Sequence, residues 1–420
     1  MKSIFKRFSN FIGICFLISP CIAFSQPRGI HINFSNDGGV ISNAMTVTWF
    51  NDQSEHGTIK YGTSANKWDQ TAQAVEVYSS TLKTYVNKIS LQNLKSATVY
   101  YYAAGSDKNG WSAVHHFKTP PKPGSPIKIV VGLWSDTQNN GGNYNFEQTD
   151  TIVKQMGRYT YDFTIHTGDI VENGSVAKSW INYFNISESL NANYPLMSVT
   201  GNHDVVNDTA SNNFQKPFPV FYEVINLPGQ QLNYSYNYGN AHFVAINSGY
   251  AQGAEKVDKV LFREGSAEYK WLEADLKKAR EDRHIKWIIL YSHYPLFVFG
   301  VSHIQTWQNH IQPLVDKYKV DLCIAGHRHV YERHKAVRGT QVFEQNDANV
   351  YTKPTGTVYI NNGSCGGSLQ GTGGWDMPDM LFTPKQKIYT YGVLTIEANT
   401  INGKVYDKAG NEVDHFSLIK

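Results

Sequence analysis

Cysteine is scarce in this 420-residue chain, which has only four. Cys15 and Cys21 lie in the first 25 residues, so Cys323 and Cys365 are the two that remain for the rest of the chain. This number excludes a small scaffold held together by several disulfide bridges. One bridge between Cys323 and Cys365 stays open, because sequence alone does not place their side chains relative to each other.

Long apolar runs are also missing. The run Phe11 to Ile18 is too short to span a bilayer, which takes about 20 apolar residues, and no other segment reaches that length. It follows three basic residues and precedes small residues suited to cleavage, which is typical of a signal peptide. We predict a signal peptide at residues 1–25 and a secreted or periplasmic mature protein without a transmembrane segment. A lipid anchor at Cys21 is the weaker alternative, since Pro20 makes a poor cleavage site.

The chain also has no large excess of positive or negative charge. The chain has 38 Lys and Arg against 35 Asp and Glu, and the predicted signal peptide carries three of the basic residues, so 35 of each sign remain. A neutral chain without a long basic run gives no electrostatic reason to bind nucleic acid. We therefore expect a small-molecule substrate, while the oligomeric state stays open.

Residues 27–119 have an all-β pattern. Ala44 to Trp49 and Thr58 to Gly62 alternate apolar and polar side chains, and clusters of Gly, Asn, Asp and Ser separate such runs. About seven short strands in ~90 residues predict a small β-sandwich. Residues 120–126 follow as a stiff, proline-rich linker, which predicts a domain boundary there.

From residue 127 to 420, apolar strand-like runs alternate with helical stretches, which is typical of an α/β domain. Helices are expected at residues 145–156, 177–190, 267–280 and 304–318. The last ~60 residues return to strands. Turns are predicted there at Asn402-Gly403 and Gly410-Asn411.

Five of the apolar runs are followed at once by side chains that can bind metal ions. In chain order these are Asp136, Asp169, Asn202, His293, and the pair His327 and His329. The carboxyl ends of strands in open α/β sheets border the crevice where sites form, so these side chains are expected to converge. Carboxylate, amide oxygen and imidazole suit a pair of Fe, Zn or Mn ions better than soft copper. Each motif alone is weak, but five in this order rarely arise by chance.

The order Asp, Gly-Asp, Gly-Asn-His-Asp, His and Gly-His-x-His resembles that of the calcineurin-like metallophosphoesterases. The β-sandwich and the stretch Ala325 to Arg333 are similar to the purple acid phosphatase branch. The resemblance implies an all-β, fibronectin type III-like sandwich followed by a four-layer α/β/β/α catalytic domain. It also implies an exported phosphomonoesterase of the acid phosphatase type, with two divalent metal ions, a metal-bound hydroxide as nucleophile and a small phosphorylated substrate.

By motif position, the resemblance assigns Asp169 to both metal ions. The ligands that it implies for one ion alone are Asp136 and His329 at the first site, and Asn202, His293 and His327 at the second. The catalytic candidates that it implies are His203, Asp204 and His303. In purple acid phosphatases a histidine ten residues past the lone histidine ligand binds phosphate or protonates the leaving group, and His303 has that spacing here.

Two residues depart from the family pattern at the first site. Glu172 stands where purple acid phosphatases have the tyrosine that binds ferric iron, and Gln138 stands where other members have a second histidine. Gln138 and Glu172 are therefore candidate substitutes as ligands. Without the tyrosinate, Fe(III) is disfavoured, so we predict a colourless enzyme whose first divalent ion is more loosely bound.

Two other functions stay open. A phosphodiesterase or nucleotidase would use the same site, and a comparison of monoester and diester turnover separates these activities. A degenerate protein that binds one metal ion or none, without turnover, is the alternative outside the enzymes, and metal content per chain distinguishes it.

Overall fold

The computed structural model describes most of the chain. The described ranges are 26–35, 41–65, 67–139, 142–205, 218–230, 232–248, 262–296, 302–370 and 380–420, apart from the side chains of residues 42, 230 and 302–308. The predicted signal peptide, residues 1–25, lies outside these ranges. No helix within them is long and apolar enough to cross a membrane.

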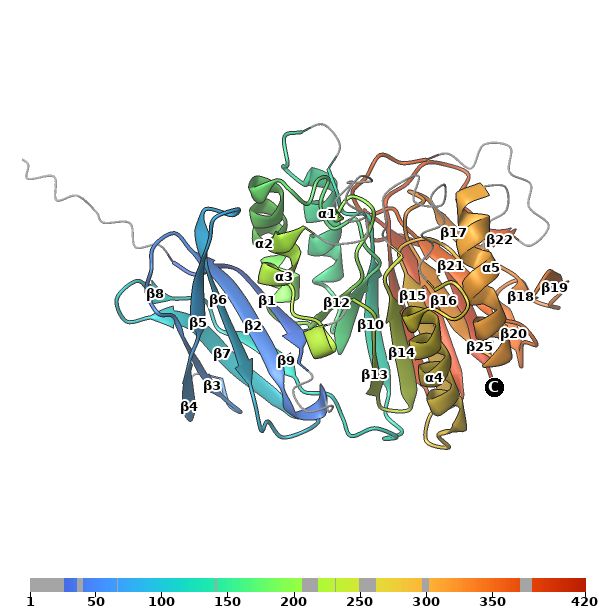
Figure 1. Ribbon diagram of the computed structural model, residues 1–420, viewed down its shortest axis with the longest axis horizontal. Coiled ribbons are helices and arrows are strands. Elements are labelled where there is room, and N and C mark those ends of the chain that lie inside the picture. The colour runs from blue at the N-terminus through green and yellow to red at the C-terminus, as the bar shows by residue number, and fades with distance from the viewer. Residues whose placement is uncertain are drawn as a thin grey trace, which may run out of the picture.

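The N-terminal part is a β-sandwich, as predicted (Figure 1). One sheet has the strand order β1 (Arg28–Phe34), β2 (Met45–Asn51), β6 (Thr84–Leu91) and β5 (Val75–Ser79). The other has the order β4 (Gln70–Gln73), β3 (Thr58–Gly62), β7 (Val99–Ser106) and β8 (Gly110–Trp111), with β9 (His115–Lys118) also paired to β7. The described residues thus contain more strands than the predicted seven, because pieces as short as β8 leave no alternating pattern in the sequence.

The C-terminal domain contains two seven-stranded sheets among the described residues. The first has the order β12 (Leu196–Ser198), β11 (Phe163–His166), β10 (Ile129–Trp134), β23 (Thr390–Glu397), β24 (Thr400–Asp407), β25 (Glu412–Ile419) and β20 (Val350–Thr352). In this sheet β10, β11 and β12 run parallel, so their carboxyl ends lie at one edge.

The second sheet repeats this parallel arrangement. Its order is β13 (Tyr234–Tyr238), β14 (Ala241–Ile246), β15 (Trp287–Ser292), β16 (Leu322–Ala325), β21 (Val358–Asn362), β17 (Tyr331–His334) and β22 (Met380–Phe382). Strands β14, β15, β16 and β21 are parallel neighbours. Every residue of β15 is buried, as expected for a parallel strand covered on both faces. A separate hairpin is formed by β18 (Ala336–Arg338) and β19 (Gln341–Phe343).

Helices cover the outer faces of the two sheets, which gives the predicted α/β/β/α order (Figure 1). Helices α1 (Glu147–Met156) and α2 (Ala177–Asn191) lie on the side of the sandwich, and α4 (Ala267–Glu281) and α5 (Ser302–Lys317) lie on the other side. The short helix α3 (Pro219–Val224) and the 3₁₀ turns η1 (Ile41–Asn43) and η2 (Pro228–Gln230) complete the elements. All four predicted helices are present, with ends shifted by at most two residues.

The sandwich is packed closely against helix α2. The ring of His31 on β1 stacks on Phe184 of α2 with ring centroids 3.8 Å apart. The Tyr102 hydroxyl donates to the carbonyl of Ala192 (2.7 Å), and the Asn33 amide donates to the carbonyl of Leu196 (2.6 Å). One continuous apolar core includes residues of both domains. The sandwich therefore covers one flank of the α/β domain.

A buried ion pair connects the two sheets of the α/β domain. Arg333 on β17 donates from Nε to Asp414 on β25 (2.7 Å), and its second contact to the same carboxylate is 2.9 Å. Tyr331 donates its hydroxyl to the same carboxylate (2.8 Å). Both charged side chains are almost fully buried, with 1% and 4% exposed.

The structure corrects one predicted turn and settles whether the two cysteines form a bridge. Asn402-Gly403 is not a turn, because both residues lie inside β24, whereas Gly410 does occupy the turn before β25. The ring of Phe416 packs so close to Gly403 that a Cβ there would be 2.3 Å from it, which explains a glycine within a strand. Cys323 and Cys365 are both buried and free, so they form no bridge.

Candidate metal centre

The predicted metal ligands come together at the carboxyl ends of the parallel strands. Among the described residues, two groups of ligand atoms lie close enough to hold a metal ion. One group consists of Asp136, Asp169 and His329, and the other of Asp169, His293 and His327. Asp169 belongs to both, which is the position of a residue that bridges two ions.

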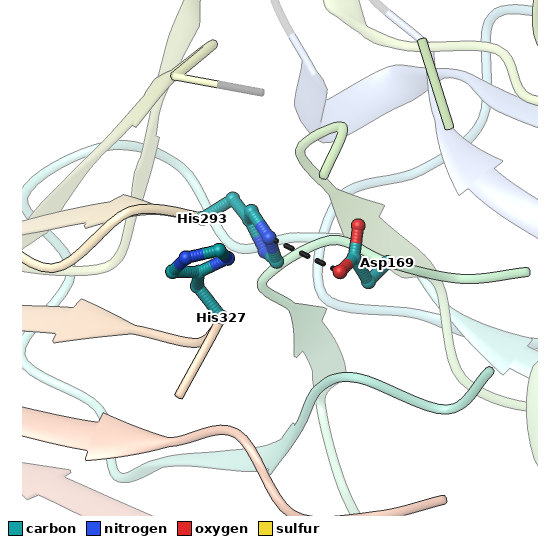
Figure 2. Close-up of side chains that lie close together, drawn as sticks. All are labelled: Asp169, His293 and His327. Atoms are coloured by element: carbon teal, nitrogen blue, oxygen red, sulfur yellow. Dashed lines mark ion pairs between the residues drawn. The ribbon is translucent and has the colours of Figure 1, made fainter. Parts of the chain in front are cut away.

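The second group is compact. His293 and Asp169 approach to 3.3 Å between Nε2 and Oδ2, and they point toward each other beside His327 (Figure 2). The Asn202 side-chain oxygen lies 3.0 Å from His293 Nε2 and 3.0 Å from His327 Nδ1. All four predicted ligands of the second ion thus face one point, with two nitrogen and two oxygen donors.

The first group is arranged around Asp136 and His329. His329 Nε2 lies 3.4 Å from Asp136 Oδ1. Asp136 is fully buried and also accepts the backbone N–H of His327 (3.0 Å) and the hydroxyl of Ser135 (2.5 Å). The Gln138 amide nitrogen lies 3.2 Å from both Asp169 Oδ2 and His329 Nε2.

Backbone carbonyls orient the histidine rings. His293 donates from Nδ1 to the carbonyl of Thr167 (2.8 Å), and His329 donates from Nδ1 to the carbonyl of Ser368 (2.8 Å). In each ring the remaining nitrogen, Nε2, therefore faces the ligand group. A hydrogen bond of this kind fixes the tautomer and the ring orientation of a metal ligand.

Three of the candidate ligands have unfavourable backbone angles, which the surrounding structure must stabilise. Asp136, Asp169 and His327 have positive φ angles of 51°, 51° and 69°, in the left-handed region that non-glycine residues rarely adopt. Such strain is concentrated at functional sites. Gly201 is required beside them, because a Cβ there would lie 2.1 Å from Asp169 Oδ1.

The electrostatics of the buried cluster favour positive charge at its centre. Burial alone would lower the pKa of His293, but the Asp169 carboxylate outweighs this and raises that pKa to about 9. Burial would raise the pKa of Asp169, but the charge and hydrogen bond of His293 hold it well below its usual range. Carboxylates in this state are suited to a cation.

The structure places the other predicted site residues in different surroundings. His203 follows Asn202, donates its backbone N–H to Asp169 Oδ1 (2.8 Å), and its Nε2 lies 3.9 Å from Asp169 Oδ2. Glu172 has a carboxylate oxygen 3.7 Å from His203 Nδ1 and belongs to neither ligand group. His303 lies on α5, where its side chain is outside the described part of the chain.

Asp204 supports the loop that carries the bridging residue. It is fully buried, and its carboxylate accepts the backbone N–H groups of Gly201 (2.8 Å), Ile170 (3.1 Å) and Val171 (3.3 Å). These bonds tie the loop after β11 to the loop after β12. In this geometry Asp204 positions the two loops, and its catalytic role stays a prediction.

Several residues that support the site are not among those predicted from the sequence. His166 Nδ1 accepts the N–H of Gly168 (3.2 Å), and its Nε2 lies 3.0 Å from the Thr137 hydroxyl. Tyr294 packs on His327 with ring centroids 4.2 Å apart. Both residues adjoin a predicted motif, which is the one signal that could have marked them. Ser368 acts through its backbone carbonyl, for which the sequence holds no signal.

Comparisons with known families agree with this site. Residues 129–331 match the calcineurin-like phosphoesterase family, and residues 27–119 match the purple acid phosphatase N-terminal domain. Acid phosphatase type 7 of Danio rerio is 26% identical over 97% of this chain and 94% of its own length. Probable purple acid phosphatase 20 of Arabidopsis thaliana is 26% identical over 82% of this chain and 75% of its own length.

Solved structures show the same fold. Purple acid phosphatase PPD1 from yellow lupin (Lupinus luteus) seeds superposes with a TM-score of 0.76 at 19% identity, over 94% of this chain and 74% of that one. PhoD gives a TM-score of 0.67 at 14% identity, over 93% and 92%.

Fold, ligand groups and family matches together define a metallophosphoesterase, a hydrolase that acts on phosphoric esters. The N-terminal sandwich and the sequence relatives identify a narrower branch of this class. The chain belongs to the calcineurin-like metallophosphoesterase superfamily as a purple acid phosphatase-like protein.

The donor set fits the dinuclear metal centre that this family implies. The second group offers carboxylate, amide and two imidazole donors, and the first offers two carboxylates and one imidazole. Hard and borderline divalent cations accept such donors. In addition, Gln138 Oε1 is a buried acceptor at the edge of the first group, and it has no hydrogen-bond partner among the residues that the structure describes.

Proposed function

We propose that this protein is an exported phosphomonoesterase that uses two divalent metal ions. The observation that carries the proposal is the pair of buried ligand groups that share Asp169. The acid phosphatase relatives support a monoester as substrate. We also propose the division into a signal peptide at residues 1–25, a sandwich at 27–119, a linker at 120–126 and a catalytic domain at 127–420.

Each residue of the site has a proposed role in metal binding or positioning. Asp136 and His329 would hold the first ion, Asn202, His293 and His327 the second, and Asp169 both. Two such ions, when bound, supply a water of lowered pKa as nucleophile and offset the negative charge on the phosphoryl oxygens. Asp204 holds the loops after β11 and β12 together, and thereby fixes the position of Asp169.

His203 is proposed to hold the phosphoryl group or to protonate the leaving oxygen. Its ring is partly exposed, at 36%, which leaves it accessible to a substrate, while its Nδ1 is 2.7 Å from the carbonyl oxygen of Glu172. The Nδ1 donates to this carbonyl, so Nε2 is the nitrogen free to face a substrate. His303 keeps the same two candidate roles as a prediction.

Replacing His203 by glutamine is expected to lower kcat by roughly 10²-fold, the usual contribution of a general acid. Metal content should stay unchanged, because the backbone N–H of His203, which contacts Asp169, is retained. Steady-state kinetics with elemental analysis measure both quantities. Retention of full kcat would contradict the role, and loss of metal would show that His203 acts on the ligands instead.

The metal-loaded protein is expected to be colourless. The purple colour of the family comes from a tyrosinate bound to ferric iron, and Glu172 stands at that position here. An absorption spectrum of the iron-loaded protein checks this. A charge-transfer band in the visible range would contradict the proposed divalent centre.

A substrate panel with metal analysis tests the function itself. Purified protein loaded with Mn, Zn or Fe should hydrolyse p-nitrophenyl phosphate faster than bis-p-nitrophenyl phosphate at equal concentration. The reverse order would assign a phosphodiesterase or nucleotidase to the same site. One ion or none per chain, together with no turnover in any of the three metals, would leave a binding protein and refute the proposal.

A further inference from the structure

Gln138 lies beside the first ligand group. It lies in the loop after β10, two residues beyond Asp136, and only 1% of it is exposed. Its amide nitrogen is 3.2 Å from Asp169 Oδ2 and 3.2 Å from His329 Nε2. Both of these are atoms that the proposed first ion would use. The carboxamide is therefore directed at the centre of the group.

The nitrogen and the oxygen of this carboxamide differ in their hydrogen bonding. The NH₂ group donates to Asp169 and His329, while Oε1 is buried without a hydrogen-bond partner among the described residues. A buried acceptor left without a partner is unfavourable, because it has lost its hydrogen bonds to water without replacing them. Rotation by about 180° about the last side-chain bond exchanges the two ends with little change in shape. The side chain can thus present either a donor or an acceptor to the group.

A cation at the first site would favour the acceptor. The lone pairs of Asp169 Oδ2 and His329 Nε2 would then point at the ion, so they could no longer accept from the NH₂ group. An NH₂ group facing the ion would be repelled, whereas an amide oxygen is a good ligand for hard divalent ions. The rotation would also give the unpartnered oxygen a partner.

We propose that Gln138 is the fourth protein ligand of the first metal ion, bound through its side-chain oxygen. The inference rests on the two-ion site of the proposed function and completes it. Gln138 replaces an anionic or imidazole donor by a neutral oxygen, so the first site has three oxygen donors and one nitrogen. The second site has two nitrogens, from His293 and His327. The first site should therefore prefer Mn²⁺, and the second Zn²⁺ or Fe²⁺.

Glu172 is the other residue considered for this position. Its carboxylate lies 3.7 Å from His203 Nδ1, and burial together with the Asp169 charge raises the pKa of Glu172. It belongs to neither group of converging ligand atoms among the described residues. The geometry therefore favours Gln138.

Two substitutions at this position test the inference through metal affinity, without reference to turnover. Titration with Mn²⁺, followed by the loss of the free-ion signal in electron paramagnetic resonance, gives the affinity of each site. In Gln138→Met, which keeps the length but removes both polar ends, one of the two Mn²⁺ sites should lose about 10–100-fold in affinity. The other site should change less than twofold.

Gln138→Glu separates a ligand from a hydrogen-bond donor. If the side-chain oxygen binds the ion, the added negative charge should tighten Mn²⁺ binding. If the NH₂ group merely positions Asp169 and His329, the same change removes the donor and places a carboxylate beside Asp169, so binding should weaken. Weaker binding in Gln138→Glu, or wild-type affinity in Gln138→Met, overturns the inference.

Gln312→Met is the matched control. Gln312 is also a buried glutamine, 9% exposed, but it lies on α5 and donates to the carbonyl of Gly339 (2.6 Å). It should leave both Mn²⁺ affinities unchanged, and thermal unfolding in chelator checks that all variants fold. If the affinities follow the inference but no phosphate ester is hydrolysed, the proposed function fails and the ligand assignment stands. If esters are hydrolysed but Gln138→Met binds Mn²⁺ with wild-type affinity, the ligand assignment fails and the proposed function stands.

Discussion

Asp169→Asn is expected to abolish phosphate-ester hydrolysis and to reduce the bound metal from two ions per chain to one or none. Asparagine keeps the shape of the side chain but removes the negative charge shared by both ligand groups. Two bound ions would stabilise the transition state by several kcal/mol. A loss on the order of 10³-fold or more in kcat/KM is therefore expected. Elemental analysis and steady-state kinetics on the same preparation measure the two effects.

Asp275→Asn provides the matched control for this change. Asp275 is also a partly buried aspartate paired with a histidine, since its carboxylate lies 2.9 Å from His242 Nε2. It lies on α4, away from both ligand groups. This variant should keep two ions and full activity. If Asp169→Asn retained two ions and more than a tenth of the activity, the bridging assignment would be wrong.

Asp414→Asn should cause the largest loss of stability of any single change considered for this chain. The substitution leaves the Arg333 guanidinium, 1% exposed, without its counter-charge. Removal of one partner of a buried ion pair costs about 3–5 kcal/mol, because the remaining charge is uncompensated. Denaturant unfolding followed by tryptophan fluorescence measures the change in the free energy of unfolding.

Two further variants make this result interpretable. Glu412→Gln breaks the exposed pair with Lys404 (2.8 Å) and should cost about 0–1 kcal/mol. The double replacement Arg333→Met with Asp414→Leu should be less destabilising than Asp414→Asn alone, since it leaves no buried charge. A double variant as unstable as the single one would show that hydrogen bonds, rather than charge, account for the effect.

The fold and the convergence of the candidate ligands could be predicted because they depend on local patterns. Ser266 caps helix α4 by accepting the N–H of Tyr269 (3.1 Å), and Leu272, Leu276 and Ala279 repeat on its buried face. Such signals lie within one element, so the helix bounds were predicted to within two residues. The candidate ligands could be found for a similar reason, since each one lies within four residues of the end of a strand.

What could not be predicted depends on residues far apart in the chain. Gly403 was assigned to a turn because glycine is common in turns, but its role is set by the ring of Phe416 on the neighbouring strand. The orientation of His329 depends on the carbonyl of Ser368, where any residue type would serve. Asp204 was placed among the catalytic residues by its motif, while its bonds to backbone N–H groups become visible only in the folded loops.

The close packing of the sandwich on helix α2 has a consequence for how the chain can be divided. A shortened chain that began at residue 127 would expose the face of α2 that carries Phe184, together with the carbonyls of Ala192 and Leu196 that now accept side-chain hydrogen bonds. That face belongs to the same core as β10 and β11, the strands followed by the loops that carry Asp136 and Asp169. The sandwich thus packs behind the strands that lead to the metal ligands, and a cut at the linker would remove one side of the core that supports them.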